Sequence, residues 1–496
     1  MYKFESIKLD KNHPQHLYVQ LYKMIKELIL LGHLKEADRL PPVRAMSKML
    51  EINNVTVVKA YEILEKEGLV YKKIGSGTYI SKQLINQLNE VDQESKQQTN
   101  IRSQLMEQGH IKVEKNMINF ASATPSADLF PVEDFKQVLN EVLDRDKGYA
   151  FDYQEGQGYY QLRKILKDYI FHYGIKSEVE NIQIISGAQQ GIDIISKALV
   201  NYGDYVLIES PSYTGAMAAF NSRGAKMIDI PLQKDGLDLD ILEKKIKTHK
   251  PRFIYVMPNF QNPTGISYSP GKKKELLKIC KNYNMYIVED DYLSDLNFYS
   301  EDNTTLKKLD EDELVIYIKS FSKIFMPGLR LGFLVIPSKL HENLLMAKHT
   351  TDISTSGLLQ RAFELYLDKG IWQQHLKYME DKYKERFVVM KESIKEYFPE
   401  YISYSLPLGG VNFWFKLPKG FSSKELYERS VVKNIIFAPG NLFFMNNNDE
   451  GYFRLSIAAV NPSEIKYGIK ILSIVIREYI DKRRDQRNDS LIKPIL

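Results

Sequence analysis

The chain has 496 residues, 44% of them hydrophobic and 26% charged, which is ordinary for a soluble globular protein. Single hydrophobic cores stop growing near ~250–300 residues, so this length predicts two or more domains. The one cysteine, Cys280, excludes an internal disulfide framework, and no apolar run approaches the ~18 residues of a membrane span, so we expect a cytoplasmic protein with no membrane partner.

The first elements are three helices and a hairpin. Apolar residues recur at helical spacing over residues 14–31, and shorter helices are predicted at 40–50 and 53–68, the last capped by Asn53 or Asn54. Residues 69–81 alternate apolar and polar side chains on both sides of Gly75, which predicts a two-stranded wing. Together they predict a winged helix-turn-helix, whose third helix would enter the DNA major groove.

The net charge of the chain is concentrated in this segment. Residues 1–82 hold 14 Lys and Arg against 9 Asp and Glu, whereas the remaining residues hold 54 of each, so the whole excess of +5 lies at the start. This asymmetry favours a small nucleic-acid-binding module on a neutral body. Charge alone would fit a solvated surface equally well.

The stretch "LPPVRAMSKMLEINNVTVVKAYEILEKEGLVYKKIGSGTYI" resembles the DNA-binding domain of GntR-type bacterial regulators, over about residues 12–81. The family often has a serine-arginine pair where Asn53 and Asn54 stand, and a glycine at the position of Glu51. The resemblance implies double-stranded DNA as a partner. We expect the contacts to come from Arg44, Asn53, Asn54, Thr56, Lys59 and Gly75. Arg44 and Lys59 are expected to bind phosphates, and Asn54 to read a base.

Residues 83–116 are rich in Gln, Asn and charge, and they are predicted to be a flexible linker. From residue 117 to 482, apolar runs such as "IQIIS", "FIYVMP" and "YIVED" alternate with helical stretches. This alternation predicts an α/β domain with a mainly parallel sheet. We expect a frayed tail at 483–496.

Several motifs in this second domain match the needs of one cofactor chemistry. An amine that reacts with an aldehyde cofactor must be desolvated and close to cations, and Lys323 in "SFSK" is a candidate. A pyridine ring that accepts electrons needs a carboxylate beside its nitrogen, and Asp290 follows an apolar strand. A phosphate needs amides at a helix start, as at Ala188 and Gln189, together with hydroxyls and an arginine.

Seven motifs occur in the order found in the fold-type I aminotransferases that use pyridoxal 5'-phosphate, over residues 117–482. These are "YQEGQGYYQLR", "SGAQQ", "PNFQNPTG", "EDDY", "SFSK…GLRLG", "PLGGVNFWF" and "FRLS". The resemblance implies this cofactor and predicts no metal site. Relatives often carry a hydroxyl at the position of Ala188. Gly215 supplies no second cation beside Tyr213 for a distal substrate carboxylate.

The resemblance also implies a role for each residue. Lys323 would bind the cofactor covalently, and Asp290 would pair with the pyridine nitrogen. The remaining cofactor contacts would be Asn262 and Tyr292 at the 3-oxygen, Tyr213 on the ring face, and Ala188, Gln189, Ser320, Ser322 and Arg330 at the phosphate. Tyr153 would reach the phosphate of a partner subunit, which implies a homodimer. Arg454 would bind the α-carboxylate of a substrate or effector.

A winged helix followed by an aminotransferase-like domain resembles the MocR subfamily of GntR regulators. The resemblance implies a transcriptional regulator that responds to pyridoxal 5'-phosphate and to an amino compound. Because a dimer presents two winged helices, we expect an operator with two half-sites. Two alternatives stay open at this point: an active aminotransferase with an accessory DNA-binding domain, and a cofactor reservoir whose winged helix contacts a protein.

Overall fold

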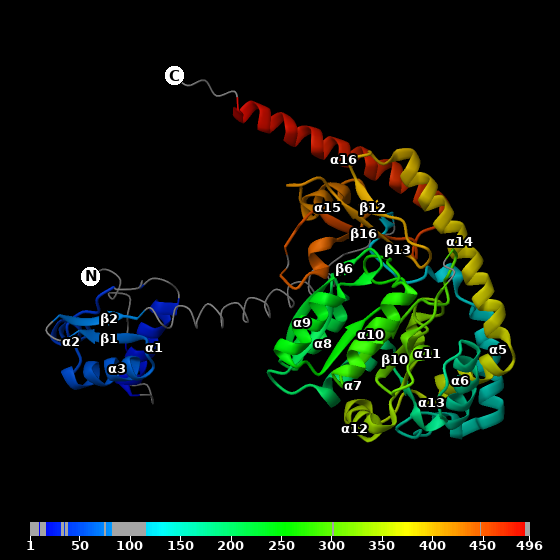
Figure 1. Cartoon of the computed structure of the whole chain (residues 1–496), viewed down its shortest axis with the longest axis horizontal. Coiled ribbons are helices and arrows are strands. Elements are labelled where there is room, and N and C mark those ends of the chain that lie inside the picture. Colours follow the sequence, from blue (N-terminus) through cyan, green and yellow to red (C-terminus); the bar gives the residue numbers. More distant parts are fainter. Residues whose placement is uncertain are drawn as a thin grey trace. The chain divides into compact units, whose positions relative to one another are not determined.

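The computed structural model describes residues 9, 16–30, 34, 38–73, 76–81, 116–299, 302–446 and 448–491. The chain divides into two units, Met1–Thr99 and Asn100–Leu496 (Figure 1). The predicted linker lies outside the described residues, apart from residue 116. Among the residues that are described, no helix is long and apolar enough to cross a membrane.

The smaller unit is a winged helix-turn-helix, as the sequence predicts. Its elements are α1 (Leu17–Leu30), α2 (Val43–Leu50), α3 (Asn54–Lys66), β1 (Val70–Lys73) and β2 (Gly77–Ile80). The two strands pair antiparallel. Apolar side chains from all three helices meet in one buried cluster that includes Leu21, Ile25, Met46, Val57, Ala60 and Leu64. The helical spacing of these residues in the sequence therefore produces the core of this unit.

Two backbone positions define the turn between α2 and α3. Asn53 caps α3, since its side-chain oxygen accepts a hydrogen bond from the Val55 amide at 2.9 Å. Glu51 ends α2 in the left-handed conformation, with φ of 51°. Only glycine adopts this conformation without a steric cost, which explains physically why relatives often carry glycine here.

The larger unit is built on an eight-stranded sheet in the order β4-β11-β10-β9-β8-β5-β6-β7. Strands β10, β9, β8, β5 and β6 run parallel, whereas β11 is antiparallel to both of its neighbours and β7 is antiparallel to β6. The strands are β4 (Ile182–Ile185), β5 (Tyr205–Ser210), β6 (Lys226–Gln233), β7 (Gly236–Leu237), β8 (Phe253–Val256), β9 (Tyr286–Asp291), β10 (Val315–Ser320) and β11 (Gly332–Val335). The predicted mainly parallel sheet is confirmed.

Helices cover both faces of this sheet (Figure 1). One apolar cluster joins inward side chains of the strands to α9 (Leu239–His249), α10 (Pro270–Asn282) and α11 (Leu306–Leu309). The opposite face packs on α7 (Ala188–Leu199) and α8 (Thr214–Ser222). Alternate side chains of a strand reach opposite faces, and the strands are buried on both, which is why they appear in the sequence as continuous apolar runs.

The remaining elements complete this unit. The helices are α5 (Val132–Asp146), α6 (Tyr160–His172), α12 (His341–Asp352), α13 (Gly357–Asp368), α14 (Ile371–Tyr397), α15 (Ser423–Val431) and α16 (Pro462–Leu491). A second sheet contains β12 (Ser403–Ser405), β13 (Asn412–Lys416), β16 (Tyr452–Ser456) and β15 (Ala438–Pro439), and β14 (Ile435–Ile436) pairs with β3 (Ile118–Asn119). Short 3-10 segments lie at Ala127–Leu129, Lys147–Phe151, Val179–Asn181, Pro327–Leu329, Ser338–Leu340 and Gly440–Phe443.

The C-terminal helix is longer than the sequence suggested. We expected a frayed tail from residue 483, but α16 continues to Leu491. The stretch from 483 to 491 contains no glycine or proline, and the next proline is Pro494. Nothing in that stretch interrupts the helical backbone, so the helix extends beyond the apolar positions that anchor it.

Candidate functional site

A cavity of about 380 Å³ lies in the larger unit. Its walls include Tyr213, which follows β5, Asn262, which follows β8, and Lys323, which follows β10. The carboxyl ends of parallel strands meet at one edge of a sheet, and ligands of open α/β sheets bind there. The second sheet contributes Arg454 from β16, and the loop after β3 supplies a wall from Ala121 to Thr124.

Lys323 is the lysine in this wall. Its ammonium donates a hydrogen bond to the Thr124 hydroxyl at 3.3 Å. Burial, together with the positive charges of Arg454 and Arg330, lowers the pKa of Lys323 to about 8. A lysine with this pKa is neutral in a useful fraction of molecules near pH 7, so it can act as a nucleophile toward a carbonyl carbon.

Asp290 is the carboxylate on the same side of the sheet. One of its oxygens accepts a hydrogen bond from the Tyr255 hydroxyl at 2.6 Å. The other oxygen, Oδ1, is buried and has no hydrogen-bond partner among the described residues. Burial raises the pKa of Asp290 to about 6, although the Tyr255 hydroxyl and the nearby Lys323 favour the charged form. This oxygen is therefore able to accept a proton or an N–H group from a ligand.

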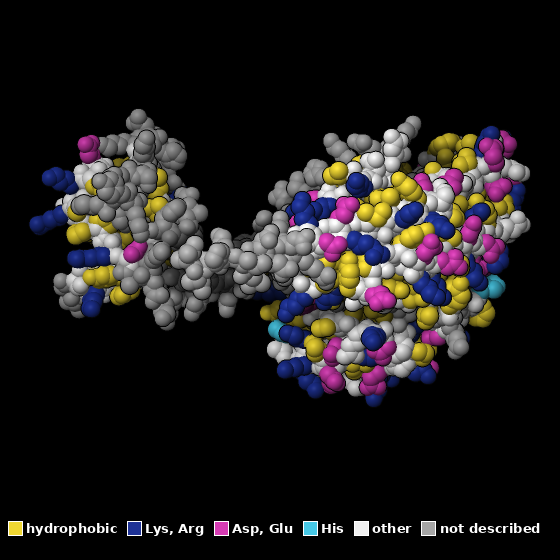
Figure 2. All heavy atoms as spheres, turned by 90° about the horizontal axis from the view of Figure 1, so that it is seen from above, with side chains coloured by type: hydrophobic (Ala, Val, Ile, Leu, Met, Phe, Trp, Pro, Cys, Tyr) yellow, Lys and Arg dark blue, Asp and Glu magenta, His cyan; other side chains and the backbone are white. Residues whose placement is uncertain are grey.

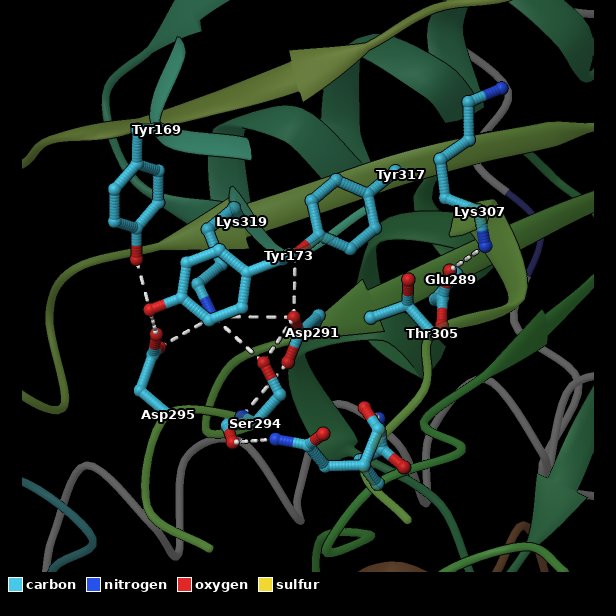
Figure 3. A network of polar contacts seen from close by, with 12 residues as sticks. Tyr169, Tyr173, Glu289, Asp291, Ser294, Asp295, Thr305, Lys307, Tyr317 and Lys319 are labelled. Atoms are coloured by element: carbon cyan, nitrogen blue, oxygen red, sulfur yellow. Dashed lines mark hydrogen bonds and ion pairs between the residues drawn. The ribbon is translucent and has the colours of Figure 1, made fainter. Parts of the chain in front are cut away.

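The neighbouring carboxylate has a different environment. Asp291 points into a polar network on the other side of β9, where it accepts hydrogen bonds from Tyr317 at 2.5 Å and Ser294 at 2.6 Å (Figure 3). Lys319 forms ion pairs with Asp291 at 3.2 Å and with Asp295 at 2.6 Å. These partners hold the pKa of Asp291 below its usual range despite burial. Successive side chains of a strand face opposite ways, which separates the two aspartates.

A polar cluster joins the two sheets at the cavity. Arg454 donates to the side-chain oxygen of Asn262 at 2.7 Å and to the carbonyl of Ala121, and burial lowers the Arg454 pKa to about 10. The Tyr292 hydroxyl donates to the Phe260 carbonyl at 2.5 Å and accepts from Asn412 at 3.1 Å. The Arg454 Nε atom is buried without a hydrogen-bond partner in the described part of the chain. The guanidinium thus retains a donor for an acidic ligand.

Tyr213 is held in place by its neighbours. Its hydroxyl donates to the side-chain oxygen of Gln189 at 3.2 Å, and the Gln189 amide donates to the Gly215 carbonyl at 2.9 Å. A Cβ atom at Gly215 would lie 2.3 Å from the Gln189 oxygen and 2.5 Å from the Tyr213 ring. Glycine is therefore required for this ring to take its position.

Hydroxyls, a helix start and an arginine gather where β4 and β10 end and β11 begins. Ser320 and Ser322 are hydrogen-bonded to each other at 3.2 Å, and Ala188 begins α7. Arg330 donates to the Ser186 carbonyl at 2.8 Å. A Cβ atom at Gly187, whose φ is 81°, would lie 2.7 Å from the Arg330 guanidinium. This set combines the donors that an anion needs, namely amides at a helix N-terminus, hydroxyls and a cation.

Tyr153 does not line this cavity. It is 80% exposed, and it borders a separate hollow with Tyr149, Tyr159, Tyr160 and Arg361. Of the other side chains proposed for cofactor binding, Tyr213, Asn262 and Lys323 line the cavity. The implied contact of Tyr153 with the phosphate site of a partner subunit stays a prediction.

Sequence analysis did not identify several residues that contact this site. Tyr255 lies in the apolar run of β8, and Thr124 is 199 residues from Lys323. Phe443 lines the cavity and lies under the Arg454 guanidinium at 5.1 Å. A tyrosine inside an apolar strand was the one available signal, since a buried tyrosine hydroxyl usually has a partner.

The side chains expected to bind DNA lie on the smaller unit. Lys and Arg side chains project from this unit, whereas basic and acidic side chains are intermingled on the visible face of the larger unit (Figure 2). Arg44, Asn54 and Lys59 are exposed, and Thr56 is half-buried. Asn53 is exposed but uses its oxygen to cap α3, and the Asn54 oxygen accepts from the Ser47 hydroxyl at 2.6 Å. Gly75 lies outside the described residues.

Comparison with known proteins identifies both units. Residues 115–472 match the family of class I and II aminotransferases, and residues 17–80 match the gntR family of bacterial regulatory proteins. The chain is a gntR-type regulator with an aminotransferase-like domain. Two regulators match this chain over both units.

The HTH-type transcriptional regulator YdfD of Bacillus subtilis is 30% identical over 468 residues, which cover 93% of this chain and 96% of that protein. A probable rhizopine catabolism regulatory protein, MocR of Rhizobium meliloti, is 27% identical over 94% of each chain. Among solved structures, the α-aminoadipate aminotransferase LysN of Thermus thermophilus, complexed with N-(5'-phosphopyridoxyl)-L-leucine, superposes with a TM-score of 0.70. It is 33% identical, and the match covers 77% of this chain and 95% of LysN.

Proposed function

We propose that this gntR-type regulator binds pyridoxal 5'-phosphate in the cavity of its larger unit and that cofactor occupancy controls its affinity for DNA. The observation that carries the proposal is the pairing of Lys323, whose pKa is lowered to about 8, with the partnerless oxygen of Asp290. Such a pair suits an aldehyde on a pyridine ring. The gntR-type unit in the same chain supplies a DNA-binding output.

The residues present fit this cofactor. Asp290 Oδ1 has no partner in the described chain and can accept the pyridinium N–H. The hydroxyls of Ser320 and Ser322, the α7 N-terminus at Ala188 and Gln189, and Arg330 suit a phosphate, and Gly187 leaves room only for a hydrogen beside Arg330. Tyr213 offers a ring face, and Asn262 with Tyr292 offers polar atoms for the 3-oxygen.

When bound, the cofactor would supply an aldehyde that an amine can attack and a ring that stabilises negative charge. The chain's own residues would supply the proton chemistry. Neutral Lys323 would donate its electron pair to the aldehyde carbon, and Thr124 would orient its nitrogen. Asp290, charged above about pH 6, would hold a proton on the ring nitrogen, and Tyr255 would fix the carboxylate orientation.

The effector is proposed to be an amino compound with a carboxylate. Arg454 lines the cavity and keeps an unpaired Nε donor among the described contacts, so it can bind that carboxylate. Such a ligand would compete with Lys323 for the aldehyde and thereby change the charge beside Asp290. Genes of vitamin B6 or amino-compound metabolism would be suitable targets for a regulator with this pair of ligands.

A homodimer in the cytoplasm is part of the proposal. Tyr149, Phe151 and Tyr153 are 76%, 70% and 80% exposed, an unusual density of aromatic side chains for a solvated surface. A second copy of the chain would cover them and would receive Tyr153 at its phosphate group. Multi-angle light scattering of the purified protein tests this: a dimer mass supports the proposal, and a monomer at micromolar concentration contradicts it.

The direct experiment is a DNase footprint of the full-length protein on the DNA upstream of its own gene, with and without pyridoxal 5'-phosphate. The proposal expects two protected half-sites whose occupancy changes with the cofactor. Equal protection in both conditions contradicts cofactor control.

An active aminotransferase is the second candidate, because Lys323 and Arg454 provide a nucleophile and a carboxylate binder in one cavity, and Asp290, whose charge interacts with that of Lys323, provides a ring partner. Mixing the holoprotein with amino-acid donors and 2-oxo acids distinguishes the two functions. Turnover at ordinary enzymatic rates, about 1–10³ s⁻¹, favours the enzyme, whereas a single half-reaction favours the sensor.

A further inference from the structure

The exposed face of α3 carries two valines. Val55 is 58% exposed and Val58 is 38% exposed, and they stand three residues apart in the first two turns of the helix. The opposite face of α3 packs Val57, Ala60 and Leu64 into the core of the smaller unit. Residues at i and i+3 lie next to each other on a helix surface, so the two valines form one apolar patch.

Isolated exposed apolar side chains are common, but these two valines reduce the stability of the helix and lie between exposed polar side chains. Valine lowers helix stability relative to alanine at an exposed helical position, because its branched side chain loses rotamer freedom. Exposed polar side chains flank the patch: Asn54 at the helix start and Lys59 after Val58. The second helix of a helix-turn-helix motif enters the major groove with its N-terminal residues, so the patch lies on the part of α3 expected to face DNA, where Lys59 would complement the phosphate charge.

We propose that Val55 and Val58 read the 5-methyl groups of thymine bases in the DNA major groove. Of the four bases, only thymine carries a methyl group on its major-groove edge, and apolar side chains recognise it by contact. The Cβ atoms of residues at i and i+3 are ~5–6 Å apart, which corresponds to between one and two base-pair steps of ~3.4 Å. Each half-site would then contain two thymines at adjacent or next-but-one base pairs.

The hydrogen bond between Ser47 and Asn54 affects how Asn54 could contribute to base recognition. Its side-chain oxygen already accepts from the Ser47 hydroxyl at 2.6 Å, which fixes the amide plane. Bidentate recognition of adenine would require the same oxygen to accept a second hydrogen bond from the base. An amide oxygen has two lone pairs, so it can accept both hydrogen bonds, but the bond from Ser47 restricts the orientation of the amide and therefore the bases that Asn54 can reach. The valine pair supplies sequence information that does not depend on this orientation.

The experiment begins with selection of binding sites from random double-stranded DNA by the full-length protein. Each thymine of the selected half-site is then replaced singly by deoxyuridine, which removes the methyl group and keeps every hydrogen-bonding atom. Binding is measured by fluorescence anisotropy at fixed salt. At two thymines of each half-site, replacement by deoxyuridine should weaken binding about 4-fold, which is the factor expected for the loss of one buried methyl group.

Val55→Ala and Val58→Ala should each abolish the deoxyuridine effect at one of these thymines while leaving it at the other. Val132→Ala is the matched control, since Val132 is also a helical valine, is 57% exposed and lies in the larger unit. Three results overturn the inference: selected sites without thymine, thymine sites that tolerate deoxyuridine, or valine variants that weaken thymine and deoxyuridine DNA equally. Any of them leaves cofactor-controlled DNA binding intact, because the footprint tests that separately.

Discussion

Asp290 and Asp291 are adjacent residues with opposite expected consequences on substitution to asparagine. Burial raises the pKa of Asp290 to about 6 from an ordinary value of 3.8. A shift of about 2 pKa units corresponds to ~3 kcal/mol, so the charged carboxylate opposes folding by that amount above pH 6. Asn removes the charge but leaves a buried amide that costs ~1–2 kcal/mol. We therefore expect Asp290→Asn to stabilise the cofactor-free larger unit by about 1–2 kcal/mol at pH 7.5.

The contribution of Asp290 to the stability of the larger unit depends on pH with a defined sign. Because its folded pKa is raised, Asp290 favours the folded state below about pH 4, and this advantage is lost as the pH rises through about 6. The stability gain of Asp290→Asn should accordingly grow between pH 4 and pH 6 and stay constant above. The same variant should bind pyridoxal 5'-phosphate about 10–100-fold more weakly, since a hydrogen bond to a charged group contributes ~1.5–3 kcal/mol.

Asp291→Asn is the matched comparison. It removes a carboxylate that pairs with the buried Lys319 and accepts from Tyr317, so we expect a loss of about 3–5 kcal/mol in the larger unit. Trp372 and Trp414 are the only tryptophans, so urea unfolding followed by tryptophan fluorescence reports this unit alone. Our assignment of the two faces of β9 is refuted if Asp290→Asn destabilises the unit while Asp291→Asn mainly weakens cofactor binding.

Three further predictions use the same protein. Lys323→Ala should purify colourless and take up no label when pyridoxal 5'-phosphate is followed by borohydride; a borohydride-fixed cofactor on another lysine would show that the wrong nucleophile was chosen. With the Lys323 pKa at about 8, covalent capture measured by stopped-flow absorbance should speed up about tenfold per pH unit below 8 and level off above, whereas a rate that still climbs to pH 10 would mean an ordinary lysine. Glu51→Gly should stabilise the turn between α2 and α3 by ~1 kcal/mol, because φ is 51° there, and slow amide exchange of α3 in the full chain about 5-fold; unchanged exchange would argue against strain at Glu51.

The sequence predicts the elements of both units because their signals are local. Helical spacing marks α1 and α3, and continuous apolar runs mark the buried strands of the larger unit. The choice of Asp290 over Asp291 also follows from the sequence, through strand alternation and family spacing. These inferences need no knowledge of which strand lies beside which.

Contacts that depend on strand order were not predictable. Tyr255 reaches Asp290 because β8 and β9 are neighbours, and Lys319 reaches Asp291 because β10 lies on the other side of β9. Neither pairing is encoded by spacing along the chain. The hydrogen bond from Thr124 to Lys323 joins residues that lie far apart in sequence, and the exposure of Val55 and Val58 depends on which face of α3 packs into the core. Tertiary packing decides all of these contacts.

One measurement tests cofactor control of DNA binding most directly. The affinity of the full-length protein for its own upstream DNA is measured by fluorescence anisotropy at fixed salt, with and without pyridoxal 5'-phosphate, for the wild type and for Lys323→Ala. We predict that the cofactor changes the affinity of the wild type and leaves that of Lys323→Ala unchanged. An equal response of both proteins, or of neither, would contradict the claim that the cofactor acts on DNA binding through Lys323.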